Sequence, residues 1–211
     1  MTDWGEFQND LAWEQYMEDQ YLTQVAEEGI DAFSRERLQA YYVDNPALAQ
    51  APLRALRMAE GLLDVSASAS LVFSASSLEI TLRDVILRPL LHGLVHNEAL
   101  ASYVAQCAVE RQGTKSSNRL LVALLQEYAD VDLSTYSREG QKVTLWDEVG
   151  RATKLRNDVV HRGEVVTDDD ARTALDVSTV LLHSIFPAVA QALDLAVDED
   201  LNVGDGGPSQ E

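Results

Sequence analysis

The stretch SASASLVFSASSLEITLRDVILRPLL, residues 66–91, decides the fold class of this chain. Its large apolar residues recur at helical spacing, namely Leu71, Leu78, Leu82, Val85 and Ile86. The serines and alanines between them have little bulk, so a neighbouring helix can approach closely. The stretch lacks the repeated Gly and Pro of a flexible linker. It therefore predicts a central buried helix, which Pro89 ends or kinks.

The segments on either side also have the spacing of helices. Helices are predicted at about 6–28, 34–44, 53–63, 98–111, 118–129, 146–160 and 168–195. The last begins at Thr167, a good N-cap, and three acidic residues follow where the helix dipole favours negative charge. No run alternates convincingly at period two, so strands are not needed. The chain is predicted to be all-α.

The chain divides into three regions by this pattern. Residues 1–46 are predicted to form an N-terminal helical arm, which either packs on the main domain or binds a partner. Residues 47–195 carry the stronger apolar pattern of a helical bundle. Residues 196–211 end in GDGGPSQE and are expected to be a disordered acidic tail.

The charge balance limits the functions open to the protein. Of 211 residues, 16 are basic and 35 are acidic, which gives a formal charge of −19. Such a surface repels nucleic acid and anionic membranes, so any nucleic-acid role requires a locally basic site. Cys107 is the only cysteine, which excludes an intrachain disulfide and a cysteine zinc cluster. With no secretory h-region and no apolar run of about 20 residues, we expect a cytoplasmic protein without membrane contact.

The segment KLRNDVVHRG, residues 154–163, is harder to explain as helix and core alone. On a helix, Asn157 and His161 share a face, and Arg156 lies about 100° round on its flank. Gly163 permits a left-handed exit directly afterwards. A guanidinium suits phosphate and an imidazole can transfer protons, so the three residues could support metal-free cleavage of an RNA phosphodiester. Alternatively, they are a surface ion-pair donor, a filler residue and a helix-end histidine.

The same residues resemble the signature of the HEPN superfamily (higher eukaryotes and prokaryotes nucleotide-binding). That signature is an arginine, a polar residue and then a histidine, which here reads RNDVVH with Arg156, Asn157 and His161. The resemblance covers residues 47–195. The run ASLVFSASSLEITLRDVIL is similar to the family's long second helix, where an acidic residue, here Glu79, often faces the site.

The resemblance implies an antiparallel bundle of four to five core helices that forms a homodimer, in which two copies of the motif make one composite site. It implies a metal-independent endoribonuclease in a toxin–antitoxin or phage-defence system, with RNA as substrate and no cofactor. Apart from the resemblance, Lys154 and Arg162 could build a locally basic supporting patch with Arg156, with Arg151 nearby, and dimerisation would double it. An antitoxin or defence-system protein would be a further partner. The alternative is a non-catalytic HEPN module that binds a nucleotide, an RNA or a protein. Gly163 stands where some relatives carry a modified tyrosine, which argues against adenylylation there.

Other polar residues point less clearly to a site. His92 and His96 are four apart, but no third metal ligand is evident and Gly93 replaces the glutamate of an HExxH motif. His183 is interpreted as a histidine at the edge of the core. The acidic residues 168–170 are explained by helix-start electrostatics.

Overall fold

The computed structural model describes residues 33–94, 122, 125–126, 132–133 and 135–206. The helices in these ranges are residues 33–44, α2 Gln50–Leu62, α3 Ala67–Ile80, α4 Arg88–Leu94, α7 Leu145–Arg162, α8 Asp168–Val180 and α9 Phe186–Ala192. The all-α prediction is confirmed, with one short hairpin added. The helices expected at 6–28 and 98–111, and most of the one expected at 118–129, lie outside the described residues.

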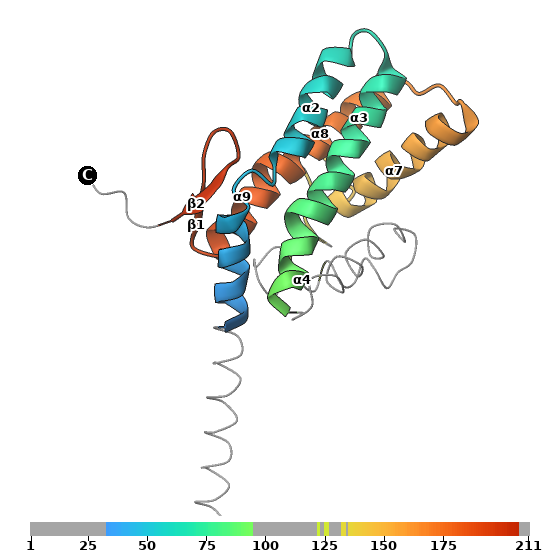
Figure 1. Cartoon of the computed structure of the whole chain (residues 1–211). Coiled ribbons are helices and arrows are strands. Elements are labelled where there is room, and N and C mark those ends of the chain that lie inside the picture. Colours follow the sequence, from blue (N-terminus) through green and yellow to red (C-terminus); the bar gives the residue numbers. More distant parts are fainter. Residues whose placement is uncertain (1–32, 95–121, 123–124, 127–131, 134, 207–211) are drawn as a thin grey trace, which may run out of the picture.

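Helix α3 is the centre of the bundle. It runs antiparallel to α2 and packs against α2, α7 and α8 (Figure 1). Its small side chains allow a close approach, because Ser70 donates a hydrogen bond to the carbonyl of Ala59 at 2.8 Å and Ser77 donates to that of Pro52 at 2.9 Å. The predicted close packing of the serine-rich stretch therefore includes hydrogen bonds between helices.

Two serines of the bundle have no such partner. The hydroxyls of Ser74 on α3 and Ser178 on α8 are fully buried and make no hydrogen bond with any residue that the structure describes. Burying a hydroxyl without a partner costs free energy, about 1–3 kcal/mol in proteins.

We therefore expect Ser74→Ala and Ser178→Ala each to raise the free energy of unfolding by about 1 kcal/mol. Urea denaturation measures the free energy of unfolding of each variant. Ser77→Ala is the matched control and should lower stability, because it removes the bond to the Pro52 carbonyl. Equal losses of stability in all three variants would contradict this interpretation.

The two long helices pass through prolines by means of π-helical turns. Between α3 and α4 the π segment is Thr81–Leu87, and between α8 and α9 it is Leu181–Ile185. Pro89 and Pro187 each follow such a turn. A proline clashes with the carbonyl four residues earlier, and a π turn widens the helix at that point. Pro89 therefore does not end the helix, which continues to Leu94.

In a regular α-helix the N–H of residue 89 would donate to the carbonyl of Val85, but Pro89 has no N–H. The hydroxyl of Tyr42 donates a hydrogen bond to the Val85 carbonyl at 2.7 Å. Tyr42 is fully buried, and its ring lies 6.2 Å from that of Phe186. Burial raises the pKa of the Tyr42 hydroxyl far above its usual value. The helix at 33–44 thus satisfies a backbone group deep in the bundle.

Side chains of the helix at 33–44 also bind the end of α9. Arg35 donates to the carbonyl of Ala192 at 2.7 Å, and Gln39 donates to that of Leu193 at 2.8 Å. Leu38 belongs to the hydrophobic core. The described part of the predicted arm is therefore packed on the bundle, which was one of the two alternatives left open by the sequence.

Residues 196–206 depart from the disordered tail that was expected at 196–211. Strands β1 Leu195–Val197 and β2 Val203–Asp205 form an antiparallel hairpin beside α9 (Figure 1). Leu201 and Val203 are buried, and the Val203 N–H donates to the carbonyl of Pro46 at 3.0 Å. These two side chains anchor a segment whose strands are too short to show an alternating pattern.

One continuous helical stretch, Asp168–Ala192, is long and apolar enough by length and composition to cross a membrane. Half of its most apolar window is buried inside the protein. That degree of burial is typical of a core helix.

For Tyr42→Phe we expect the free energy of unfolding to fall by about 1–2 kcal/mol near pH 7, because the Val85 carbonyl loses its donor. Above about pH 10 the unfolded wild type releases this proton while the folded protein retains it, so the wild type loses stability and the gap between the two proteins narrows. Denaturant unfolding between about pH 7 and pH 11 measures the gap. A gap that stays constant would contradict the burial of this hydroxyl.

Candidate functional site

Helix α7, which carries the RNDVVH segment, has well-defined ends. At its start, the Thr144 hydroxyl accepts the Asp147 N–H at 3.2 Å. At its end, Gly163 adopts φ 68° and ψ 24°, and its N–H donates to the carbonyl of Val159 at 3.0 Å. The left-handed exit predicted at Gly163 is confirmed. His161 therefore lies in the last turn of α7.

The guanidinium of Arg156 lies between α7 and α3. One nitrogen contacts a carboxylate oxygen of Glu79 on α3, and another donates to the Oδ1 atom of Asn157 at 2.8 Å. The side chains of Arg156 and Glu79 are each 24% exposed. The structure thus brings Glu79, Arg156 and Asn157 together in one partly buried cluster that remains open to solvent.

His161 lies on the exposed side of the same helix. It shares a face with Asn157 and Lys154, which are also exposed. Within the described residues its ring makes no hydrogen bond, and it lies about 140° round the helix from Arg156. One copy of the chain therefore does not bring the guanidinium of Arg156 into contact with the imidazole of His161.

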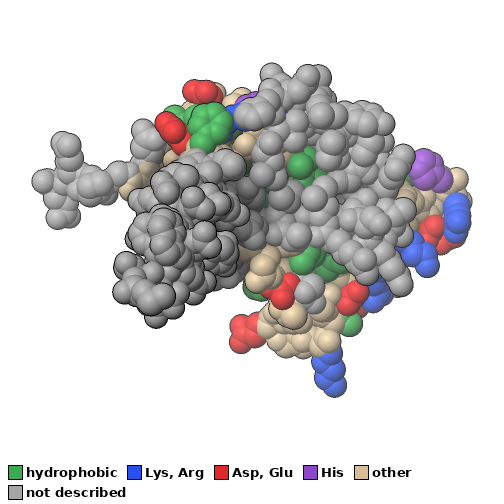
Figure 2. Space-filling view, turned by 90° about the horizontal axis from the view of Figure 1, so that it is seen from below, with side chains coloured by type: hydrophobic (Ala, Val, Ile, Leu, Met, Phe, Trp, Pro, Cys, Tyr) green, Lys and Arg blue, Asp and Glu red, His purple; other side chains and the backbone are tan. Residues whose placement is uncertain are grey.

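The second half of α7 is basic in an otherwise acidic chain. Residues 151–162 contain four of the 16 basic residues and only one acid, Asp158. Figure 2 shows Lys or Arg side chains gathered with a histidine at the right-hand side, which is the side of α7 in Figure 1. Arg162 pairs with Asp158 at 3.0 Å, and Arg151 pairs with Asp170 at 2.7 Å.

A second feature, which the sequence did not indicate, lies at the other end of α7. A cavity of about 340 Å³ opens between residues 141–143, the start of α7 and the start of α8. Glu148, whose side chain is only 4% exposed, lines it. Arg138 binds both Glu148 oxygens, at 2.8 and 2.7 Å, and also Asp176 at 3.2 Å. In the sequence, the signal for this pair was the position of Glu148 on the apolar face of α7, next to Val149, because an acid that is buried there needs a partner.

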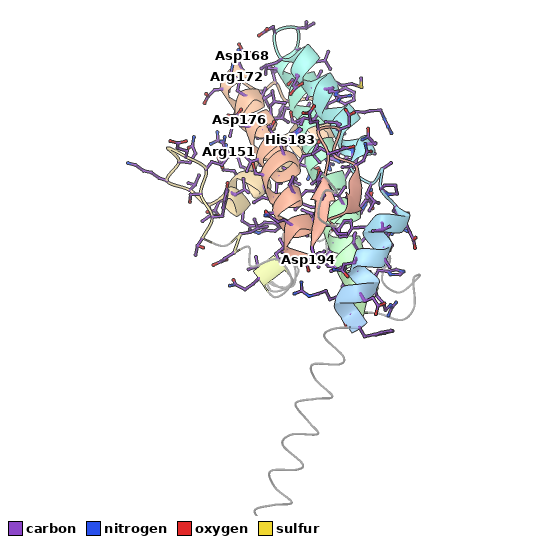
Figure 3. The ribbon with its side chains drawn as sticks, turned by 90° about the vertical axis from the view of Figure 1, so that its left-hand side faces the viewer. Arg151, Asp168, Arg172, Asp176, His183 and Asp194 are labelled. Atoms are coloured by element: carbon purple, nitrogen blue, oxygen red, sulfur yellow. The ribbon has the colours of Figure 1, made fainter. Side chains whose placement is uncertain are left out.

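The acidic residues 168–170 begin α8. The Thr167 hydroxyl accepts the Asp170 N–H at 3.1 Å and donates to its carboxylate at 2.7 Å. This bond, followed by the Arg151 contact, lowers the pKa of Asp170. Figure 3 shows Asp168, Arg172 and Asp176 along the outer side of α8, with Arg151 nearby. The predicted N-cap at Thr167 is confirmed, and the three acids lie in the first turn of α8, as expected from helix-start electrostatics.

His92 and His183 are not part of the cluster of Glu79, Arg156 and Asn157. The sequence suggested that His183 lies at the edge of the core. In the structure it is exposed on the π turn after α8 (Figure 3). The ring of His92 lies 4.7 Å from that of Tyr41, and His96 lies outside the described residues. In the part of the chain that the structure describes, no three His, Cys, Asp or Glu side chains are grouped to hold a metal.

Comparisons of the chain with protein-family models, with curated proteins and with solved structures found no match. A function for this protein is therefore inferred from the residues of the chain itself.

We expect Arg138→Met to lower the free energy of unfolding by about 3–5 kcal/mol, because it leaves the Glu148 carboxylate buried and unpaired. The double variant Arg138→Met, Glu148→Met should recover most of that loss, since no buried charge remains. Chemical denaturation of the three proteins measures this. A double variant no more stable than Arg138→Met would contradict the assigned role of the pair.

Proposed function

We propose that this protein is a HEPN-type, metal-independent endoribonuclease that acts in the cytoplasm, in a toxin or phage-defence system. The observation that supports it is the arrangement on α7. Asn157 and His161 are exposed on one face, and Arg156 is held on the flank by Glu79. These are the groups needed to bind a phosphodiester and to transfer a proton beside it.

In the proposed reaction the 2′-hydroxyl of the RNA is the nucleophile. His161 acts as general acid/base and accepts the 2′-hydroxyl proton, while Arg156 stabilises the charge that develops on the phosphorus oxygens. The new bond joins the 2′-oxygen to phosphorus, and the bond to the 5′-oxygen breaks. That oxygen takes up a proton, so the products are a 2′,3′-cyclic phosphate and a 5′-hydroxyl. Asn157 orients the substrate or Arg156.

The proposed active species is a homodimer. Because Arg156 and His161 point to different sides of α7, a second copy is needed to bring an imidazole opposite a guanidinium. Val160 lies between them in sequence and is 53% exposed, an apolar side chain suited to contact with the second copy. Two copies also bring together two segments 151–162, in which four basic residues outnumber one acid, although ion pairs offset most of that charge.

One observation favours a second candidate, a non-catalytic HEPN module that binds a nucleotide, an RNA or a protein partner such as an antitoxin. General bases are usually oriented by a hydrogen bond from a third group. Within the described residues His161 has no such bond, and Arg156 already has an ionic partner. This candidate predicts specific binding without turnover.

Purified protein incubated with total RNA in EDTA distinguishes the two candidates. We expect cleavage by the wild type and a loss of about 10²–10⁴-fold in His161→Ala, because the proton-transfer group is removed. His183→Ala is the matched control, since His183 is also an exposed helical histidine, and it should cleave like the wild type. Cleavage that persists in His161→Ala, with the fold intact by circular dichroism, would contradict this mechanism.

A further inference from the structure

The cations of α7 are almost all neutralised by neighbouring acids. Arg151 is paired with Asp170, Arg156 with Glu79, and Arg162 with Asp158. Among the described residues Lys154 alone of the four makes no ion pair. The site therefore has little positive charge in excess, although its segment of sequence is basic.

From this balance we infer that Glu79 determines which phosphate the site accepts. Arg156 and its surroundings take the singly charged phosphodiester inside a nucleic-acid strand and discriminate against the doubly charged terminal monoester. This inference rests on the proposed function, because it assumes that Arg156 binds a phosphate of the substrate. It makes Glu79 a specificity-determining residue as well as a support for Arg156.

The donor count allows a phosphate to bind without displacing Glu79. A guanidinium has five N–H donors, and one bond each to Asn157 and Glu79 leaves three. The carboxylate then remains next to the bound phosphate. Both side chains are only 24% exposed, so water and salt screen this negative charge less than on an open surface.

The charge on the ligand determines which phosphate binds more tightly. A phosphodiester has one negative charge at neutral pH, whereas a monoester has about −1.5 to −2, since its second pKa is about 6. Arg156 compensates the first charge. The second faces the Glu79 carboxylate, and Lys154, which makes no ion pair among the described residues, lies about 200° round the helix from Arg156 and does not balance it. Internal linkages of RNA are therefore preferred over 3′-phosphate ends and free mononucleotides.

Two small ligands that differ by one methyl group and one charge test this. They are 2′-O-methyladenosine 3′-methylphosphate, a diester, and 2′-O-methyladenosine 3′-phosphate, a monoester. Neither has the 2′-hydroxyl needed for cleavage. Titration calorimetry at about pH 8 should show the wild type binding the diester about five- to tenfold more tightly, a ratio typical of one partly buried charge contact.

Glu79→Gln should bring this ratio close to one, chiefly by tighter binding of the monoester, while Glu79→Asp, which keeps the charge, should retain the preference. Glu60→Gln is the matched control, because Glu60 is exposed on α2 and its substitution changes the net charge by the same single unit. The ratio in that variant should equal that of the wild type.

The wild type provides a measurement that does not depend on how a variant folds. Its preference should shrink as the pH falls from about 8 to about 5.5, because the monoester then becomes singly charged. An unchanged ratio in Glu79→Gln, or a wild type that prefers the monoester, overturns the inference and leaves the proposed ribonuclease standing. If Arg156→Ala binds both ligands as tightly as the wild type, phosphate binding by Arg156, and with it the proposed function, is wrong.

Discussion

The ion pair between Glu79 and Arg156 is the contact on which the geometry of the site depends. It joins α3, the centre of the bundle, to α7, the helix that carries His161. Without it, a long arginine side chain on the surface of α7 would sample many rotamers. With it, the guanidinium is fixed beside Asn157, at the edge of the basic half of α7. The same carboxylate restricts the charge that the site can accept.

The bundle that holds this pair is continuous through two prolines. In each long helix a π turn precedes the proline. In the α3–α4 helix, where Pro89 has no N–H to donate, the Tyr42 hydroxyl donates a hydrogen bond to the carbonyl of Val85. The helix at 33–44 therefore satisfies a backbone carbonyl of the α3–α4 helix, and it also binds the end of α9. Residues that the sequence assigns to an arm have a structural role in the core.

Much of the fold can be predicted from local patterns in the sequence. Apolar spacing located α3, α7 and α8, and the cap residues Thr167 and Gly163 marked helix ends correctly, because these signals act over a few residues. The π turns, the β1–β2 hairpin and the Arg138–Glu148 pair were missed. The hairpin and the first π turn involve contacts between distant segments, namely Val203 with Pro46 and Tyr42 with Val85, which no local pattern encodes. Arg138 and Glu148 are only ten residues apart, and the acid on the apolar face of α7 indicated that a partner exists but not which residue it is.

The candidate site was predictable in its residue types but not in its balance of charge. The sequence indicated Arg156, Asn157, His161 and Glu79, and the structure adds that Asp158 and Asp170 neutralise neighbouring cations.

The most direct measurement of the proposed mechanism is the chemistry of the RNA ends after incubation in EDTA. We expect 2′,3′-cyclic phosphate and 5′-hydroxyl ends. Products with 3′-hydroxyl and 5′-phosphate ends would contradict the mechanism, because water rather than the 2′-hydroxyl would then be the nucleophile.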